Sequence, residues 1–158
     1  MITYDEDTAF SLADDAATVS ALVRRTDQAT LQGRRFGEWT ALEALGHLAD
    51  SAEIFAERVR RCLEEVEPVI ASFDQDAIAA ERRNATGDPI EFSRRMQRAH
   101  QSIVQLMLRP GASLRTGVHA EWGTVTAAHF AGYQARHSRE HVAELGAAFP
   151  PRLGPGAT

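Results

Sequence analysis

Cysteine is almost absent from the sequence: Cys62 is the one cysteine in 158 residues, so no internal disulfide can form. This is typical of proteins from a reducing compartment, and we expect a cytoplasmic location. No apolar run approaches the roughly 20 residues that span a bilayer, so we expect no membrane partner. The amino terminus, MITYDEDTAF, is acidic and lacks the apolar segment of a secretory signal peptide.

Basic residues are outnumbered by acidic ones. Lys and Arg together number 17, Asp and Glu number 22, and the formal net charge is -5. A protein that binds duplex DNA normally presents a basic face, so we expect no nucleic acid partner. Many of the arginines stand in adjacent pairs interleaved with acids, and we interpret them as solvated helix faces. They are Arg24, Arg25, Arg34, Arg35, Arg60, Arg61, Arg82, Arg83, Arg94 and Arg95.

Strand-like alternation is also lacking, whereas apolar residues recur at helical spacing. The pattern predicts four long helical segments, which are 7–31, 40–66, 88–108 and 124–148. The second opens with the capping box Thr40-Ala41-Leu42-Glu43, in which the first and last side chains cap each other's backbone. Asp88 is the expected N-cap of the third, and Thr124 that of the fourth.

The segments between these helices are of mixed length. Residues 73–85 are expected to form a short crossing helix, and 109–123 a polar, Gly-rich loop outside the core. The tail 150–158 is rich in Pro and Gly and is expected to be flexible. The sequence therefore predicts one all-α domain over 1–149, a four-helix bundle.

Two histidines stand four positions apart in the segment ARHSREHVAELGAA, His137 and His141. Residues four apart are neighbours on a helix surface, so both imidazoles can reach one ion. At about 100° per residue, His141 falls inside the apolar stripe of its helix and His137 at the edge of that stripe. His129 falls with the charged residues and is excluded from the pair. Because such pairs also arise by chance, a solvated pair without metal is an open alternative.

A third histidine, His47, lies at the border of the apolar stripe of segment 40–66, about 100° from its centre. That position suits a metal ligand at the rim of a bundle, and it equally suits an amphipathic residue with no ligand role. His100 and His119 are interpreted as surface or loop residues.

The stretches that carry a recognisable pattern are WTALEALGHLADSAEIFAERVRRCLEE (39–65), SFDQDAIAAE (72–81) and GTVTAAHFAGYQARHSREHVAEL (123–145). Together they resemble the DinB/YfiT-like superfamily of four-helix-bundle proteins. The resemblance rests on a tryptophan before the second helix, a G-H-L-A-D segment within it, and the H-x-x-x-H pair in the last. It implies one divalent metal on three histidines, and the matching positions here are His47, His137 and His141.

Three neutral imidazoles leave a divalent ion with an open position for a water or a substrate atom. All-nitrogen ligation suits zinc, nickel, iron or copper, of which we expect zinc or nickel. Characterised members of the superfamily are transferases or isomerases that use mycothiol, bacillithiol or glutathione. The resemblance thus implies a thiol-dependent S-transferase or isomerase for a small electrophilic molecule, with a low-molecular-weight thiol as cosubstrate. A metal-dependent hydrolase and a non-catalytic metal-binding stress-response protein are the alternatives.

No catalytic acid or base stands out in the sequence. Glu43 and Asp50 are the local candidates for a general base that hydrolysis would need. Asp50 and Glu144 could accept the second N–H of a ligating histidine, although both are interpreted first as plain surface charges. Cys62 is interpreted as a packing residue.

Two further expectations concern binding. Arg34, Arg35 or Arg115 could meet an anionic group of the substrate, and no feature of the sequence singles one out. The apolar stripe of residues 11–25 is expected to pack in the core of the bundle. It could instead pack outward against a second copy, which makes a homodimer the alternative.

Overall fold

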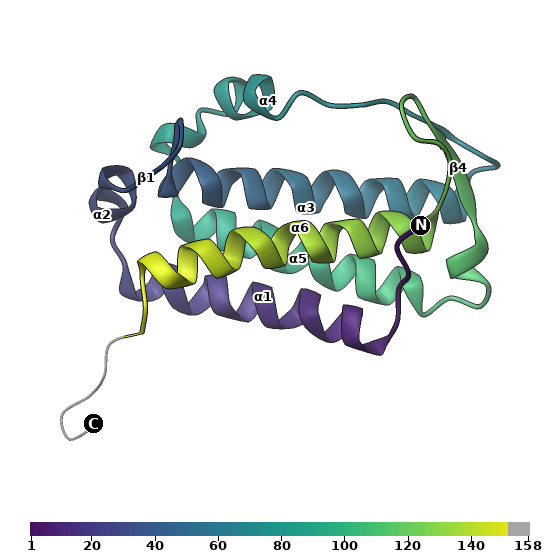
Figure 1. The fold of residues 1–158 in the computed structure, drawn as a ribbon, viewed down its shortest axis with the longest axis horizontal. Coiled ribbons are helices and arrows are strands. Elements are labelled where there is room, and N and C mark those ends of the chain that lie inside the picture. The colour runs from purple at the N-terminus through teal and green to yellow at the C-terminus, as the bar shows by residue number, and fades with distance from the viewer. Residues whose placement is uncertain (152–158) are drawn as a thin grey trace.

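The computed structural model describes residues 1–151, and the expected flexible tail lies mostly outside the described residues. Four long helices form the body: α1 (Glu6–Arg25), α3 (Ala41–Glu64), α5 (Pro89–Met107) and α6 (Ala127–Ala148). Helices α1 and α3 each pack against both α5 and α6, so α1 and α3 lie on one diagonal of the bundle and α5 and α6 on the other (Figure 1). The four-helix bundle expected from the helical periodicity is confirmed.

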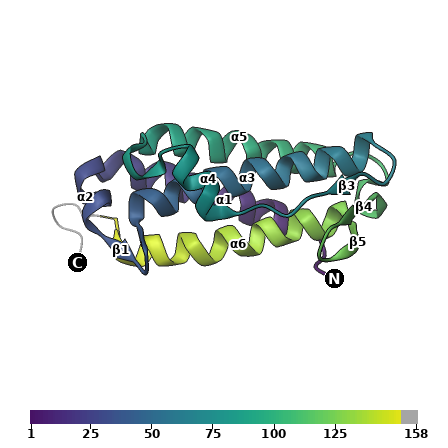
Figure 2. The same ribbon diagram turned by 90° about the horizontal axis from the view of Figure 1, so that it is seen from above.

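A long crossover follows α3 and returns the chain to the other end of the bundle. It contains strand β3 (Val69–Ile70), helix α4 (Gln75–Glu81) and a 3-10 turn, η1 (Asn84–Thr86). Because of this return, α3 and α5 run in the same direction (Figure 1). In Figure 2 the crossover lies between α3 and α6, so it covers the groove between those two helices.

The helix ends follow the capping chemistry of the sequence. Thr40 and Glu43 form the expected capping box of α3, and Asp88 caps α5 with Pro89 in its first turn. The N-cap of α6 is Thr126, whose side chain accepts a hydrogen bond from the His129 N–H, and the expectation that Thr124 fills this place is wrong. Residues 123–126 are extended because they pair with a neighbouring strand.

The first predicted helix is divided in two. Helix α1 ends at Arg25, and α2 (Gln28–Gly33) begins after Asp27, whose side chain accepts a hydrogen bond from the Thr30 N–H. An aspartate at an N-cap favours a new helix start over continuation of the old one. The apolar stripe of α1, which includes Leu12 and Leu22, is buried inside the bundle, as expected from its composition.

Short strands are present where the sequence pattern predicted none. Strands β1 (Arg35–Phe36) and β2 (Trp39–Thr40) form a hairpin before α3. Strand β4 (Thr116–His119) pairs in parallel with β3 and antiparallel with β5 (Gly123–Thr126). The interpretation of 109–123 as a loop outside the core is therefore wrong in part: a 3-10 turn, η2 (Ala112–Leu114), precedes β4, and His119 is buried.

Among the helices of residues 1–151, none is both long enough and apolar enough to cross a bilayer.

Candidate metal centre

Helices α3 and α6 bring three imidazoles together at one end of their shared groove. The Nε2 atom of His137 lies 3.0 Å from Nε2 of His47 and 3.1 Å from Nε2 of His141. One ligand atom from each of the three lies within 4.8 Å of the others. Three nitrogens bound to one tetrahedral ion at 2.0–2.1 Å would stand about 3.3 Å apart. The three histidines therefore fit the first coordination sphere of a single zinc-like ion.

The imidazoles are held in their neutral form. Burial lowers the pKa of His47 to about 3, with a further contribution from the neighbouring His137 and His141. Burial likewise lowers the pKa of His137 to about 4 and moves that of His141 downward. A neutral ring offers a lone pair, and three lone pairs facing one point repel each other unless a proton or a cation lies between them. Their convergence therefore suits a cation.

The second ring nitrogen of His137 enters a chain of hydrogen bonds through the core. Its Nδ1 lies 3.2 Å from Ser51 Oγ, and the serine hydroxyl donates to Gln134 Oε1 at 2.9 Å. Gln134 Nε2 is 3.1 Å from His100 Nε2, and His100 Nδ1 is 2.7 Å from the Leu12 carbonyl oxygen. That carbonyl can only accept, so His100 carries its proton on Nδ1 and accepts from Gln134 at Nε2.

The donor and acceptor roles in this series of hydrogen bonds fix which ring nitrogen of His137 carries the proton. The Gln134 amide donates through nitrogen to His100 and accepts through oxygen from Ser51, so the Ser51 oxygen is left to accept from His137 Nδ1–H. With the proton on Nδ1, the Nε2 lone pair of His137 points to the other two histidines. Ser51 and Gln134 thus select the tautomer that a metal ligand needs.

Replacing Ser51 with alanine is expected to weaken metal binding by about 10- to 100-fold, the typical cost of losing the partner of a ligating histidine. The competition of the protein with a chromogenic chelator for zinc measures this. Ser93→Ala removes another buried serine, on α5, and is the matched control. Equal affinities for the two variants would contradict a positioning role for Ser51.

Of the two acids interpreted first as surface charges, Asp50 and Glu144, that interpretation is wrong for Asp50. Asp50 is no surface charge: it is 3% exposed and accepts hydrogen bonds from Arg82, Asn84 and Arg95. The expectation that Arg95 belongs to a solvated face fails for the same reason. Glu144 is exposed, as interpreted.

Two further histidines differ from their sequence interpretation, and one agrees with it. His100 is 1% exposed and His119 is 4% exposed, so neither is a surface residue. Burial lowers the pKa of His100 to about 4. His129 stays apart from the three converging rings, as expected from its helix face, and accepts a hydrogen bond from the Ile2 N–H through Nδ1.

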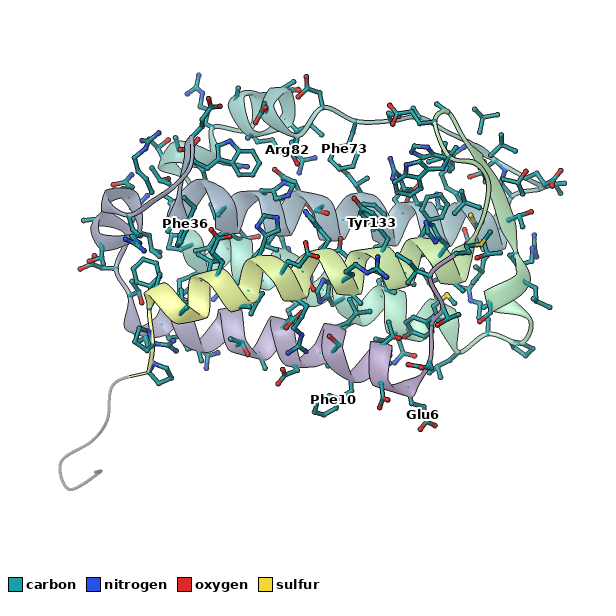
Figure 3. All side chains as sticks on the ribbon, viewed as in Figure 1. Glu6, Phe10, Phe36, Phe73, Arg82 and Tyr133 are labelled. Carbon is teal, nitrogen blue, oxygen red and sulfur yellow. The ribbon has the colours of Figure 1, made fainter. Side chains whose placement is uncertain are left out.

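A pocket of about 150 Å³ opens beside the histidines and runs along the groove between α3 and α6. Residues of α3, α6, the crossover and the β4–β5 turn line it, among them His47, Ser51, Phe55, Tyr133 and His137. Figure 3 shows Phe73 reaching from the crossover toward the helix that carries Tyr133. The pocket is therefore bounded by α3 and α6 on one side and by the crossover and the β4–β5 turn on the other.

Other residues proposed from the sequence lie outside this pocket. Arg34, Arg35 and Arg115 are not among its lining residues. Cys62 is fully buried, and burial raises the pKa of its thiol to about 11, which confirms a packing role. Glu43 accepts the Thr40 N–H in the capping box, so its carboxylate is engaged at the helix end.

Sequence reasoning missed Ser51, Gln134 and Arg58. Each has a helical signal: Ser51 is one turn after His47, Gln134 one turn before His137, and Arg58 three turns after His47 on the same face. The signal is weak because serine, glutamine and arginine at such positions are usually solvated.

The four-helix bundle with three converging histidines beside a small pocket defines the class to which the protein is compared, a helical bundle with a candidate metal site. Residues 11–145 match the model of the DinB superfamily, and the chain belongs to that family. The structure is similar to that of YfiT from Bacillus subtilis, described as a probable metal-dependent hydrolase with an unusual four-helix bundle topology. The TM-score is 0.77 at 24% identity, covering 90% of this chain and 86% of that one. No curated protein matches the sequence.

Proposed function

We propose that this chain is a divalent-metal-dependent enzyme that joins a small thiol to an electrophilic small molecule, with His47, His137 and His141 as the metal ligands. The observation that carries the proposal is the open set of three neutral imidazoles beside a pocket. Among residues 1–151, no cysteine or carboxylate joins the three. A structural zinc site normally has four protein ligands, so three favour a site with room for a reactant.

The chain's own residues prepare the site in three ways. Burial keeps the histidines neutral, and Ser51 with Gln134 holds His137 in the ligating tautomer. A bound divalent ion would favour the thiolate form of a cosubstrate's sulfur, which is the nucleophilic form. The protein supplies no thiol, because Cys62 is buried away from the pocket lining.

Hydrolysis is the second candidate, and the similarity to YfiT favours it. A hydrolase of this kind normally uses a group near the ion that can hold and pass on a proton. The two acids nearest His47 in sequence are already engaged, Asp50 by two arginines and an asparagine and Glu43 by a helix cap. Sulfur transfer does not need a proton-transfer group of the protein near the ion, and we therefore prefer it to hydrolysis.

A direct comparison of the two reactions tests the proposal. Zinc- or nickel-loaded protein is incubated with 1-chloro-2,4-dinitrobenzene and, in turn, glutathione, mycothiol or bacillithiol. Sulfur replaces chloride on the ring, chloride leaves, and the thiol proton passes to the buffer. We expect conjugate formation at least tenfold above the rate without protein, and no such rise with metal-stripped protein or with His141→Ala.

Two results would contradict sulfur transfer. Release of 4-nitrophenolate from 4-nitrophenyl acetate without any thiol, lost on metal removal, would make hydrolysis the function. Metal binding with no turnover of either substrate would leave a non-catalytic metal-binding protein.

A further inference from the structure

A buried arginine stands at the far end of the pocket from the histidines. Arg58 lies on α3 and lines the same pocket as His47, although it is only 5% exposed. Its guanidinium carbon is 4.8 Å from the ring centre of Phe55, 5.3 Å from that of Phe73 and 5.6 Å from that of Phe130. Phe55 precedes Arg58 by one turn, so the side chain points back along α3 toward the histidines.

The charge of this arginine has no acidic partner within residues 1–151. The hydrogen bond that its guanidinium makes is to the Ala71 carbonyl oxygen, at 2.9 Å. The other largely buried arginine of α3 and α5, Arg95, is instead paired with Asp50 and Glu53. Burial lowers the pKa of Arg58, and no carboxylate offsets that effect. Burying a cation without an anionic partner is unfavourable, so a site that keeps one is suited to an anion from outside.

A second donor lies at the same end. Nδ1 of His119 accepts the backbone N–H groups of Glu121 and Trp122, both at 3.1 Å. The ring proton of His119 is therefore on Nε2, and this N–H has no hydrogen-bond partner in the described chain. His119 lines the pocket, so the N–H is available to a ligand there. Arg58 is close enough to contribute to lowering the pKa of His119. The acid of this lining, Glu121, is exposed.

The walls between the two ends are aromatic. Tyr133 stacks on Phe55 with ring centres 5.1 Å apart, and Trp122 lies 5.0 Å from Tyr133. The distance along α3 from His47 to Phe55 is about 12 Å at 1.5 Å per residue. A molecule about 10 Å long, with an apolar middle, therefore fits between the histidines and the guanidinium.

We propose that Arg58 and His119 bind the carboxylate of a small molecule whose apolar body lies against Tyr133 and Trp122. A planar carboxylate matches the paired donors of a guanidinium better than any neutral group. The further statement that the opposite end of this molecule reaches the three histidines rests on the proposed function. The thiol cosubstrate and the electrophile both react at the histidines, so either of them could carry the carboxylate that binds Arg58.

Calorimetric titration with a matched pair of probes tests the carboxylate site. The probes are 3-phenylpropionate and its amide, which have the same size and shape and differ in charge. The protein is stripped of metal, so that no ion can bind the carboxylate. We expect the acid to bind at least tenfold more tightly than the amide, and Arg58→Met to abolish this preference while retaining an apolar stem over the rings. Arg60→Met changes an arginine two residues away whose side chain is 40% exposed; it is the control and keeps the preference.

A second variant guards against a folding defect. Arg58→Lys retains a cation at the same place, and we expect it to preserve part of the preference that Arg58→Met loses. Equal binding of acid and amide by wild-type protein would overturn the proposal, and so would an undiminished preference in Arg58→Met. A preference that appears only after metal loading would also overturn it, because the carboxylate would then be at the histidines.

These outcomes are independent of the proposed reaction, since metal-free protein shows the preference whether or not loaded protein turns over thiols. Displacement of 3-phenylpropionate by N-acetylcysteine, but not by its methyl ester, would show that the thiol carries the carboxylate. Displacement by neither would assign the carboxylate to the electrophile.

Discussion

Replacing His47, His137 or His141 with alanine is expected to lower the affinity of the protein for zinc or nickel by more than about 100-fold. Losing the hydrogen-bond partner of a ligating histidine typically lowers metal affinity by roughly 10- to 100-fold. Losing the ligand itself should lower metal affinity by more than that. His137 should give the largest effect, because its Nε2 atom lies within 3.1 Å of the corresponding atom of both other histidines. Metal content after dialysis, measured by mass spectrometry, and chelator competition check the result.

His129→Ala is the matched control for this series, because His129 is on α6 but contacts the amino-terminal segment. It should keep about one metal per chain. The three ligand variants should also stay folded without metal, since alanine removes a polar ring, only half-buried in His137 and His141, rather than an apolar core contact. Metal content that is unchanged in the three variants, or lost equally in His129→Ala, would refute the site.

The bundle and the grouping of histidines follow from local patterns in the sequence. Helical periodicity and caps such as Thr40 and Asp88 are properties of neighbouring residues, and they locate α3 and α5 closely. The spacing of His137 and His141 is likewise local. The three histidines that the resemblance implies are the three that the fold brings together.

What the sequence could not predict depends on segments far apart in the chain. Strand β3 is short, and it forms only because it pairs with β4, about fifty residues later. His47 stands near the edge of its helix stripe yet is 3% exposed, because the Trp39 ring covers it at 4.8 Å and α6 covers its other side. Arg58 is buried because the crossover places Phe73 and the Ala71 carbonyl over it.

Asp50 is the clearest example of such a residue, and it leads to a strong prediction for stability. Its helix face carries Glu53 and Glu57, so the pattern around it is that of a solvated surface. The crossover and α5 then cover this one position with three donors: Arg82 at 2.7 Å, Arg95 at 2.6 Å and Asn84 at 2.8 Å.

We therefore expect Asp50→Ala to lower the free energy of unfolding by about 3 kcal/mol, the low end of the cost of removing one partner from a buried ion pair. For a chain of this length, that corresponds to a fall in Tm of about 10 °C. The substitution leaves the buried Asn84 amide without its acceptor, and it leaves Arg95, whose side chain is 16% exposed, with Glu53 alone. Asn84 packs directly against Gly46, where an added Cβ would lie 2.5 Å from the Asn84 Cγ, so the amide stays close to the position that Asp50 leaves.

Thermal unfolding followed by circular dichroism measures this effect, with Glu57→Ala as the control for loss of an exposed acid on the same helix. Asp50→Asn retains two acceptor sites on its oxygen and should cost less than Asp50→Ala. Below the transition temperature, Asp50→Ala should bind zinc with the stoichiometry of wild type, because none of the hydrogen bonds of Asp50 reaches a histidine. A stable variant that has lost its metal would instead mean that Asp50 acts on the histidines, and that the arginines hold it there for that purpose.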